Sequence, residues 1–465
     1  MDPTELAPTP ATPAAPLDPA ELDRRARVEA GCVPPHLVTY LLDHGHARTV
    51  HELARDGEWF CARALARALA DEDRQEEALE VLDPYVATGW WTAVDEAAAL
   101  LGAWRRVEEA LDLVRPYAEA GERSALREFA LLLGRAGRGG EAYELLRPHV
   151  ADWYLAGPLV EVSAGLGRDE EVAALLAARI APDRACARCG TTECGARYVE
   201  PHNAVALLAS VRERQGRTDE AFELLRTHGA AHVNCLDPLA EMLARHDRME
   251  ELRACAAAAS GGNAARFLAG LLEERGDVAG AVGVYRPLAE AGSPHAAVGL
   301  AELLARHGRG DEAIGVLVAL PAARGGHEDW VLDPLCALYV ARGRAEEGLA
   351  HFAGIVDPPG CEEWDLLRMR ATLLAALGRV DEAVAELRAH PEGGSAYAAE
   401  AVAGLLAGAG RVAEAVAVLD PERPDDRQPL AELLLELGRV GEAVAVLRRP
   451  LPALRPIVYS EAPPW

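Results

Sequence analysis

A short turn sequence recurs through most of the chain and limits its fold more than any other feature. It reads Gly-Arg-x-x-Glu-Ala in its clearest copies, at residues 308–313 and 438–443. If the alanine or its substitute marks each copy, the markers stand at positions 78, 110, 142, 172, 221, 252, 281, 313, 348, 383, 415 and 443. Successive markers lie 28 to 35 residues apart, except for one gap of 49 between 172 and 221. Such a period predicts an extended array of repeated supersecondary units.

Each repeat is predicted to be a pair of helices joined by the turn. Apolar residues with helical spacing precede the turn, as at Leu300 and Leu304, and others follow it, as at Ala313 and Leu317. Glycine stands at the turn in nine of the twelve repeats, where the end of a helix needs a residue that tolerates positive φ.

Prolines are expected to mark helix boundaries. One set is predicted to follow the second helix and end it: Pro84, Pro116, Pro148, Pro287, Pro391, Pro421 and Pro450. A further set predicts first helices that start late: Pro158, Pro238, Pro334 and Pro429.

An arginine follows the turn residue in eleven repeats, and a glutamate stands three residues later in eleven. The one repeat without the arginine, at Asp277, also lacks the glutamate, at Gly280. This joint loss predicts that the two side chains form an ion pair at the start of the second helix. Each exposed pair is expected to contribute about 0.2–1 kcal/mol, so the pairs serve to specify the turn.

In these features the chain resembles the tetratricopeptide repeat (TPR) family over about residues 60–449, with a degenerate extra repeat around residues 37–54. The clearest match to the family pattern consists of Leu300, Ala301, Leu304, Gly308, Ala313 and Leu317. The resemblance implies an all-α, right-handed superhelical solenoid of about 12–13 helix pairs. It also implies a non-catalytic scaffold or adaptor that binds proteins or peptides. The chain has no lysine, so all 47 cationic residues are arginine, which is typical of a high-GC bacterial member.

The expected organisation has five parts. Residues 1–20 form a disordered Pro/Ala-rich tail, and residues 21–182 form an N-terminal array. Residues 183–202 are a Cys-rich insertion, residues 203–449 form a C-terminal array, and residues 450–465 form a Pro-rich tail.

The insertion carries the strongest metal-binding pattern, Cys-x2-Cys-Gly-x3-Cys-Gly, formed by Cys186, Cys189 and Cys194. Such a knuckle suits tetrahedral zinc, with His202 as the fourth ligand or Cys235 as the alternative. With four protein ligands the zinc would be structural. Reduced thiols without a role, or a redox-active thiol pair, remain alternative interpretations.

Tryptophans near the start of several first helices leave two interpretations open. The rings of Trp59, Trp91, Trp153, Trp330 and Trp364 could pack against the neighbouring repeat or line a peptide groove.

The net charge and the composition exclude several classes of partner and of chemistry. A formal charge of -27 argues against nucleic acid and against an anionic membrane surface, and it favours a basic protein partner. Nine cysteines without a signal peptide favour a cytoplasmic protein. The sequence has no nucleophile motif, nucleotide-binding loop or His-Glu-x-x-His, so a non-catalytic scaffold is predicted. A zinc- or thiol-based redox-responsive regulator is the alternative.

Overall fold

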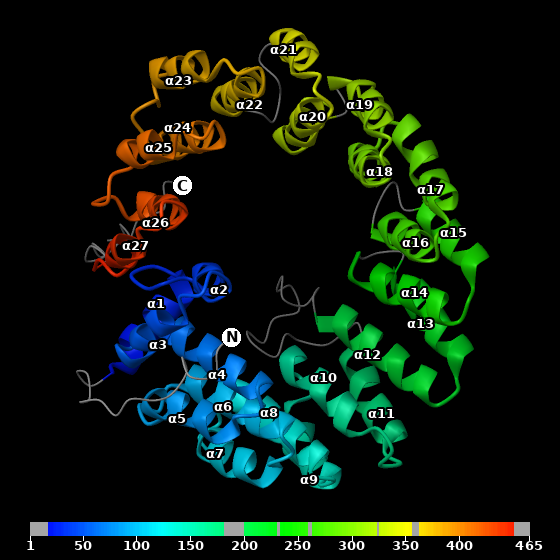
Figure 1. Cartoon of the computed structure of the whole chain (residues 1–465). Helices are drawn as coiled ribbons and strands as arrows, with labels where there is room; N and C mark the ends of the chain where they lie inside the picture. Colours follow the sequence, from blue (N-terminus) through cyan, green and yellow to red (C-terminus); the bar gives the residue numbers. More distant parts are fainter. Residues whose placement is uncertain are drawn as a thin grey trace, which may run out of the picture. The chain divides into compact units, whose positions relative to one another are not determined.

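The structure is a computed structural model that describes residues 17–180, 200–229, 233–258, 263–322, 325–355 and 362–450, without the side chains of 200–203, 233–236 and 258. Within these ranges all regular secondary structure is helical, as Figure 1 shows, and the predicted all-α class is confirmed.

The chain divides into two compact units. Unit 1 takes its described residues from 1–106 and 391–465, and unit 2 takes them from 107–390. The α-helices of unit 1 are α1 (Pro19–Val28), α2 (Pro35–Asp43), α3 (Ala47–Arg55), α4 (Trp59–Asp71), α5 (Gln75–Val86), α6 (Trp91–Ala103), α24 (Ala396–Gly408), α25 (Val412–Val418), α26 (Arg427–Glu436) and α27 (Val440–Leu447).

The α-helices of unit 2 run from α7 to α23. They are α7 (Val107–Glu119), α8 (Arg123–Arg135), α9 (Gly139–Leu146), α10 (Trp153–Val162), α11 (Asp169–Ile180), α12 (Glu200–Arg214), α13 (Thr218–Gly229), α14 (Val233–Arg245), α15 (Met249–Ala258), α16 (Asn263–Glu274), α17 (Val278–Glu290), α18 (Pro294–Arg306), α19 (Gly310–Val318), α20 (Asp329–Ala341), α21 (Ala345–Ala353), α22 (Glu363–Ala376) and α23 (Val380–Ala389).

Helices α2 to α27 form thirteen consecutive pairs, each with a turn between its two members. Twelve pairs correspond to the twelve predicted turns, and the pair α2/α3 is the degenerate repeat expected around residues 37–54. Within each unit, neighbouring helices pack in chain order (Figure 1). The number and order of the helix pairs therefore agree with the sequence period.

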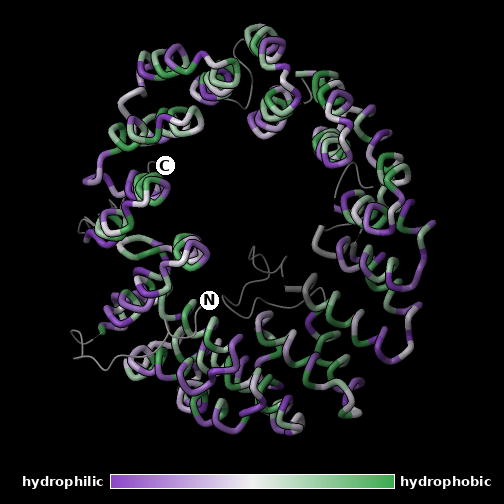
Figure 2. Tube along the Cα trace, in the orientation of Figure 1, coloured by the Kyte–Doolittle hydropathy of each residue, from purple (hydrophilic) through white to green (hydrophobic). Residues whose placement is uncertain are grey.

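The apolar stripes of the repeats form the core. Leu300 and Leu304 are each 1% exposed, and Ala313 and Leu317 are 0% and 2% exposed. Hydrophobic and hydrophilic residues alternate along the helices in Figure 2, so each helix has an apolar side to pack and a polar side for solvent.

The turns between paired helices require left-handed backbone. Gly308 has φ of 74°. The three repeats without glycine adopt the same conformation, with φ of 60° at Asp73, 62° at Arg105 and 53° at Asp247. The turn geometry is thus kept even where the residue is sterically unfavourable for it.

The predicted arginine–glutamate pairs are present at ten turns. They are Arg74–Glu77, Arg138–Glu141, Arg168–Glu171, Arg217–Glu220, Arg248–Glu251, Arg309–Glu312, Arg344–Glu347, Arg379–Glu382, Arg411–Glu414 and Arg439–Glu442. Several of these arginines also reach the preceding repeat. Arg344 Nη1, for example, lies 3.1 Å from Asp311 Oδ1. The arginine therefore links two repeats as well as closing its own turn.

The exceptional repeat replaces the ion pair with a helix cap. Asp277 accepts a hydrogen bond from the backbone N–H of Gly280 at 2.8 Å. A Cβ at position 280 would lie 2.2 Å from Asp277 Oδ2, so a side chain there would require the Asp277 carboxylate to shift. The joint loss of arginine and glutamate follows from this alternative way of satisfying the helix start.

The proline prediction is wrong at six positions, because these prolines lie inside helices. Pro84, Pro116 and Pro287 are within second helices, and Pro158, Pro238 and Pro334 are within first helices. Packing offsets the lost backbone hydrogen bond: Pro158 is buried, and Tyr85, which follows Pro84, is 1% exposed.

Residues from both ends of the chain meet within unit 1. His36 Nε2 in α2 lies 3.1 Å from Glu432 Oε1 in α26. Arg448, just after α27, places Nη1 3.3 Å from Asp56 Oδ2, just after α3. The first and last helix pairs are therefore neighbours in space.

Candidate partner-binding groove

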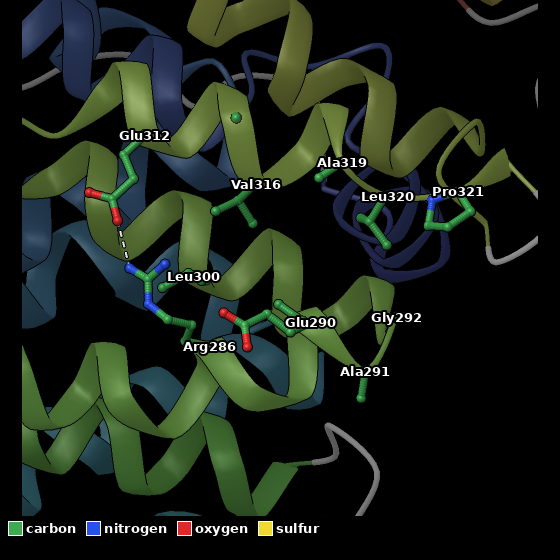
Figure 3. A pocket seen from close by; sticks show the side chains of 12 residues that line it. Arg286, Glu290, Ala291, Gly292, Leu300, Glu312, Val316, Ala319, Leu320 and Pro321 are labelled. Carbon is green, nitrogen blue, oxygen red and sulfur yellow. Dashed lines mark hydrogen bonds and ion pairs between the residues drawn. The ribbon is translucent and has the colours of Figure 1, made fainter.

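A surface groove of about 620 Å³ lies between α17 and α19 in unit 2, the second helices of two consecutive repeats. Its lining residues are Arg286, Ala289, Glu290, Ala291, Gly292, Leu300, Glu312, Gly315, Val316, Ala319, Leu320 and Pro321. Leu300 of α18 contributes to it from between the two helices, while Pro321 and Gly292 stand at the end opposite the Arg286–Glu312 pair (Figure 3). Ligand sites commonly have volumes of about 300–1,000 Å³, so the groove is large enough for a peptide side chain.

A missing side chain on α19 opens this groove. Gly315 stands two residues after the marker alanine, where six other repeats carry alanine and four carry an acid, as at Glu80, Asp112 and Glu144. A Cβ at Gly315 would have no heavy atom within 4 Å. With Ala289 and Ala319 also small, the walls leave the apolar surface of Val316 accessible above the buried Leu300. Sequence reasoning missed this site, although the glycines at 283 and 315, where the other ten repeats carry alanine or an acid, were a readable signal.

The charged residues of the groove are of two kinds. Arg286 Nη2 donates to Glu312 Oε1 at 2.5 Å, and Arg309 Nη2 lies 2.6 Å from the other oxygen of that carboxylate. The hydrogen bond from Arg286 is the main reason why the pKa of Glu312 lies below its usual range. Glu290, by contrast, is exposed and forms no ion pair within the described parts of the chain. The uncompensated charge of the groove is therefore negative.

The predicted zinc ligands cannot be compared with the groove. Cys186, Cys189 and Cys194 lie outside the described residues, and the side chains of His202 in α12 and Cys235 in α14 are also outside them. Among the side chains that are described, no three His, Cys, Asp or Glu residues are grouped as metal ligands would be.

The described cysteines are unsuited to thiolate chemistry. Burial raises the pKa of Cys32 and of Cys336 to about 12, and it also raises the pKa values of Cys61 and Cys255. Cys336 Sγ donates to the Met369 carbonyl at 3.4 Å. These four thiols stay protonated near neutral pH and act as small core residues.

The tryptophans at the starts of first helices differ in burial. Trp59 and Trp364 are 4% and 8% exposed, and the ring of Trp330 packs on His295 of the preceding repeat with centroids 4.6 Å apart. These three pack against their surroundings, as the first interpretation expects. Trp153 is 61% exposed, and the Arg123 guanidinium lies 5.5 Å from its ring centroid. The structure therefore favours a packing role at most of these positions.

None of the described helices combines the length and the apolar character needed to cross a membrane. Neither a protein-family model nor a curated protein matches the chain.

Two solved structures are similar to the chain at low identity. One is the structure of Naa15/Naa10 bound to HypK-THB, with 14% identity, coverage of 92% of this chain and 71% of that chain, and a TM-score of 0.44. The other is the pentatricopeptide repeat protein PPR10 from maize, with 15% identity, coverage of 92% and 66%, and a TM-score of 0.34. The chain itself is a helical-repeat protein, with thirteen consecutive helix pairs in the described residues.

Proposed function

We propose that the chain is a non-catalytic scaffold of the TPR type, and that it binds a peptide segment of a partner protein in the α17–α19 groove. The groove is the observation that carries this proposal, because it is a surface recess lined largely by apolar side chains such as Val316, Ala319 and Pro321. Large apolar depressions on such surfaces commonly mark interaction sites. The turn sequence supports a TPR protein, the all-arginine composition supports a high-GC bacterial source, and the nine scattered cysteines support a cytoplasmic location.

A peptide is a better occupant than a rigid domain for a geometric reason. The groove is a recess between two helices, closed at one end by the Arg286–Glu312 pair and flanked at the other by Pro321 (Figure 3). Such a recess admits one or two side chains from a narrow segment, and apolar contacts of this kind supply most of the affinity of small interfaces.

The experiment selects binders from a displayed library of random peptides with the full-length protein. Gly315→Leu fills the groove from α19, and the matched control Gly283→Leu changes the equivalent residue of α17, which does not line the groove. Both changes replace a helical glycine with a better helix former, so both variants should fold. We expect selected peptides to bind the wild type and the control equally, and Gly315→Leu at least about tenfold more weakly.

Two results would overturn the proposal. One is that no selected peptide loses affinity through Gly315→Leu. The other is that the protein binds single-stranded RNA in a Gly315-dependent manner while it binds no peptide.

We also propose that Cys186, Cys189 and Cys194, with His202 or Cys235, hold a structural zinc ion. The spacing of the three cysteines supports this proposal, since Cys-x2-Cys pairs followed by glycine suit a zinc knuckle.

A further inference from the structure

We infer that the α17–α19 groove selects segments in which an apolar side chain is followed or preceded closely by a cationic one. This inference rests on the proposed function and adds the chemistry of the partner. The apolar side chain would contact Leu300 and Val316, and the cation would lie beside Glu290.

The residues that line the α17–α19 groove favour an apolar side chain in the bound segment. Leu300 is 1% exposed and Val316 is half-buried, so these side chains form the inner surface. Ala289, Ala319 and Pro321 complete the walls and add no polar side-chain atom. An entering side chain therefore meets hydrocarbon on several sides, which favours Leu, Met or Phe over a polar residue.

The charged residues of the groove favour a cation in the bound segment. The cation of the groove, Arg286, is already held by Glu312, which is also paired with Arg309. An incoming carboxylate would compete with Glu312 for Arg286 and would be repelled by Glu290. An incoming arginine or lysine, in contrast, finds the Glu290 carboxylate free of ion pairs with the rest of the described chain.

The apolar surface of the groove and the Glu290 carboxylate lie beside each other, so one bound segment can contact both. Figure 3 shows Glu290 on the groove wall between the Arg286–Glu312 end and the Leu320–Pro321 end, beside the apolar surface. A side chain seated on Val316 and a cation near Glu290 can therefore come from one short segment.

The test repeats the peptide selection with three proteins: the wild type, Glu290→Arg, and the control Glu302→Arg. Glu302 is an exposed acid of α18 that does not line the groove. With the wild type and the control we expect enrichment of Leu, Met or Phe within four residues of Arg or Lys. With Glu290→Arg we expect the apolar preference to remain and the basic preference to disappear.

Affinity measurements give a second readout. For one enriched peptide, Glu290→Gln should weaken binding about two- to fivefold at low salt, as expected for one exposed ion pair, and should reduce the salt dependence. Glu302→Gln should leave both unchanged.

The outcomes separate this inference from the proposed function. If the enriched peptides depend on Gly315 but show no basic preference, or are indifferent to Glu290→Arg, the chemistry inferred here is wrong and the groove is still the binding site. If no peptide depends on Gly315, the proposed function fails as well.

Discussion

Nε of Arg448 lies 2.9 Å from Oε1 of Glu58, a carboxylate that is 1% exposed and comes from the other end of the sequence. The second carboxylate oxygen accepts a hydrogen bond from the backbone N–H of Val33 at 3.2 Å. Burial raises the pKa of Glu58, and Val33 and Arg448 oppose that rise by stabilising the charged form. This pair ties the last helix pair of unit 1 to the first ones.

Removing Arg448 should therefore destabilise both ends of the chain together. We expect Arg448→Ala to lower the free energy of unfolding of unit 1 by about 3 kcal/mol, the low end of the range for breaking a buried ion pair. The low end applies because the Val33 N–H still donates a hydrogen bond to Glu58. Hydrogen exchange in α4 and α27 measures the loss. The neighbouring Arg449→Ala removes only an exposed pair with Glu422 and should cost less than about 1 kcal/mol. Equal effects of the two variants would contradict the role given to Glu58.

The strained turn at Arg105 predicts a stabilising substitution. Its φ of 62° is unfavourable for a side-chain-bearing residue, so Arg105→Gly should raise the free energy of unfolding by about 0.5–1 kcal/mol. Thermal unfolding of wild type and variant measures the change. Arg135→Gly is the control: Arg135 lies in helical backbone at the end of α8, where glycine should cost up to about 1 kcal/mol. A loss of stability in both variants would disprove the strain at Arg105.

The turn arginines should differ in their contribution to stability, depending on whether they have a second ion-pair partner. Arg344 contacts Asp311 of the preceding repeat as well as Glu347, whereas Arg439 is paired with Glu442. We expect Arg344→Ala to cost about 1 kcal/mol and Arg439→Ala about 0.5 kcal/mol. A double-mutant cycle of Arg344→Ala with Asp311→Asn measures the link between repeats. A coupling energy near zero would show that this contact does not join them.

Acid should weaken the contact between α16 and α18. Glu273 accepts from Arg306 at 2.8 Å and pairs with His307 at 2.9 Å. The hydrogen bond from Arg306, with that from His307, lowers the pKa of Glu273 from 4.5 to about 2. Because the folded-state pKa is the lower one, the stabilisation is fully present above pH 4.5 and is lost as pH falls towards about 2.

The size of this effect should be about 1 kcal/mol. Hydrogen exchange in α16 and α18 between these pH values should show the loss in the wild type and not in Glu273→Gln. The adjacent Glu274→Gln should behave as the wild type, since Glu274 has no such partners among the described residues. The same acid dependence in Glu273→Gln would rule out this carboxylate as its source.

The zinc proposal predicts about one equivalent of zinc in the purified full-length protein. Elemental analysis of Cys186→Ser should give less than about half an equivalent, because a lost thiolate opens the tetrahedral site. Cys255→Ser, which changes a cysteine in α15 far from the knuckle in sequence, should keep the metal. A wild-type protein without zinc would disprove the site.

Local features of this chain could be predicted well. The helix pairs, the degenerate first repeat and ten ion pairs such as Arg309–Glu312 follow from residues within a few positions of one another, and their geometry is set by the helix itself. The left-handed turn also follows from the glycine pattern, and Arg105 shows that the backbone keeps it without glycine.

Features that join distant residues could not be predicted in the same way. Pro84 and Pro158 predict helix boundaries from sequence, but burial of their neighbours outweighs one lost hydrogen bond. The groove is formed by side chains of two repeats. The absence of a side chain at Gly315 leaves an open recess only because α17 and α18 pack beside it.

By itself the sequence determined how many helix pairs form, where they turn and which charges close each turn, because these properties depend on backbone preferences and contacts one helical turn apart. Only the tertiary structure decided that Glu58 is buried beside Arg448 and that Leu300 lies beneath an open groove. Both depend on which surfaces remain after the helices have packed, and packing is a property of many residues distant in sequence.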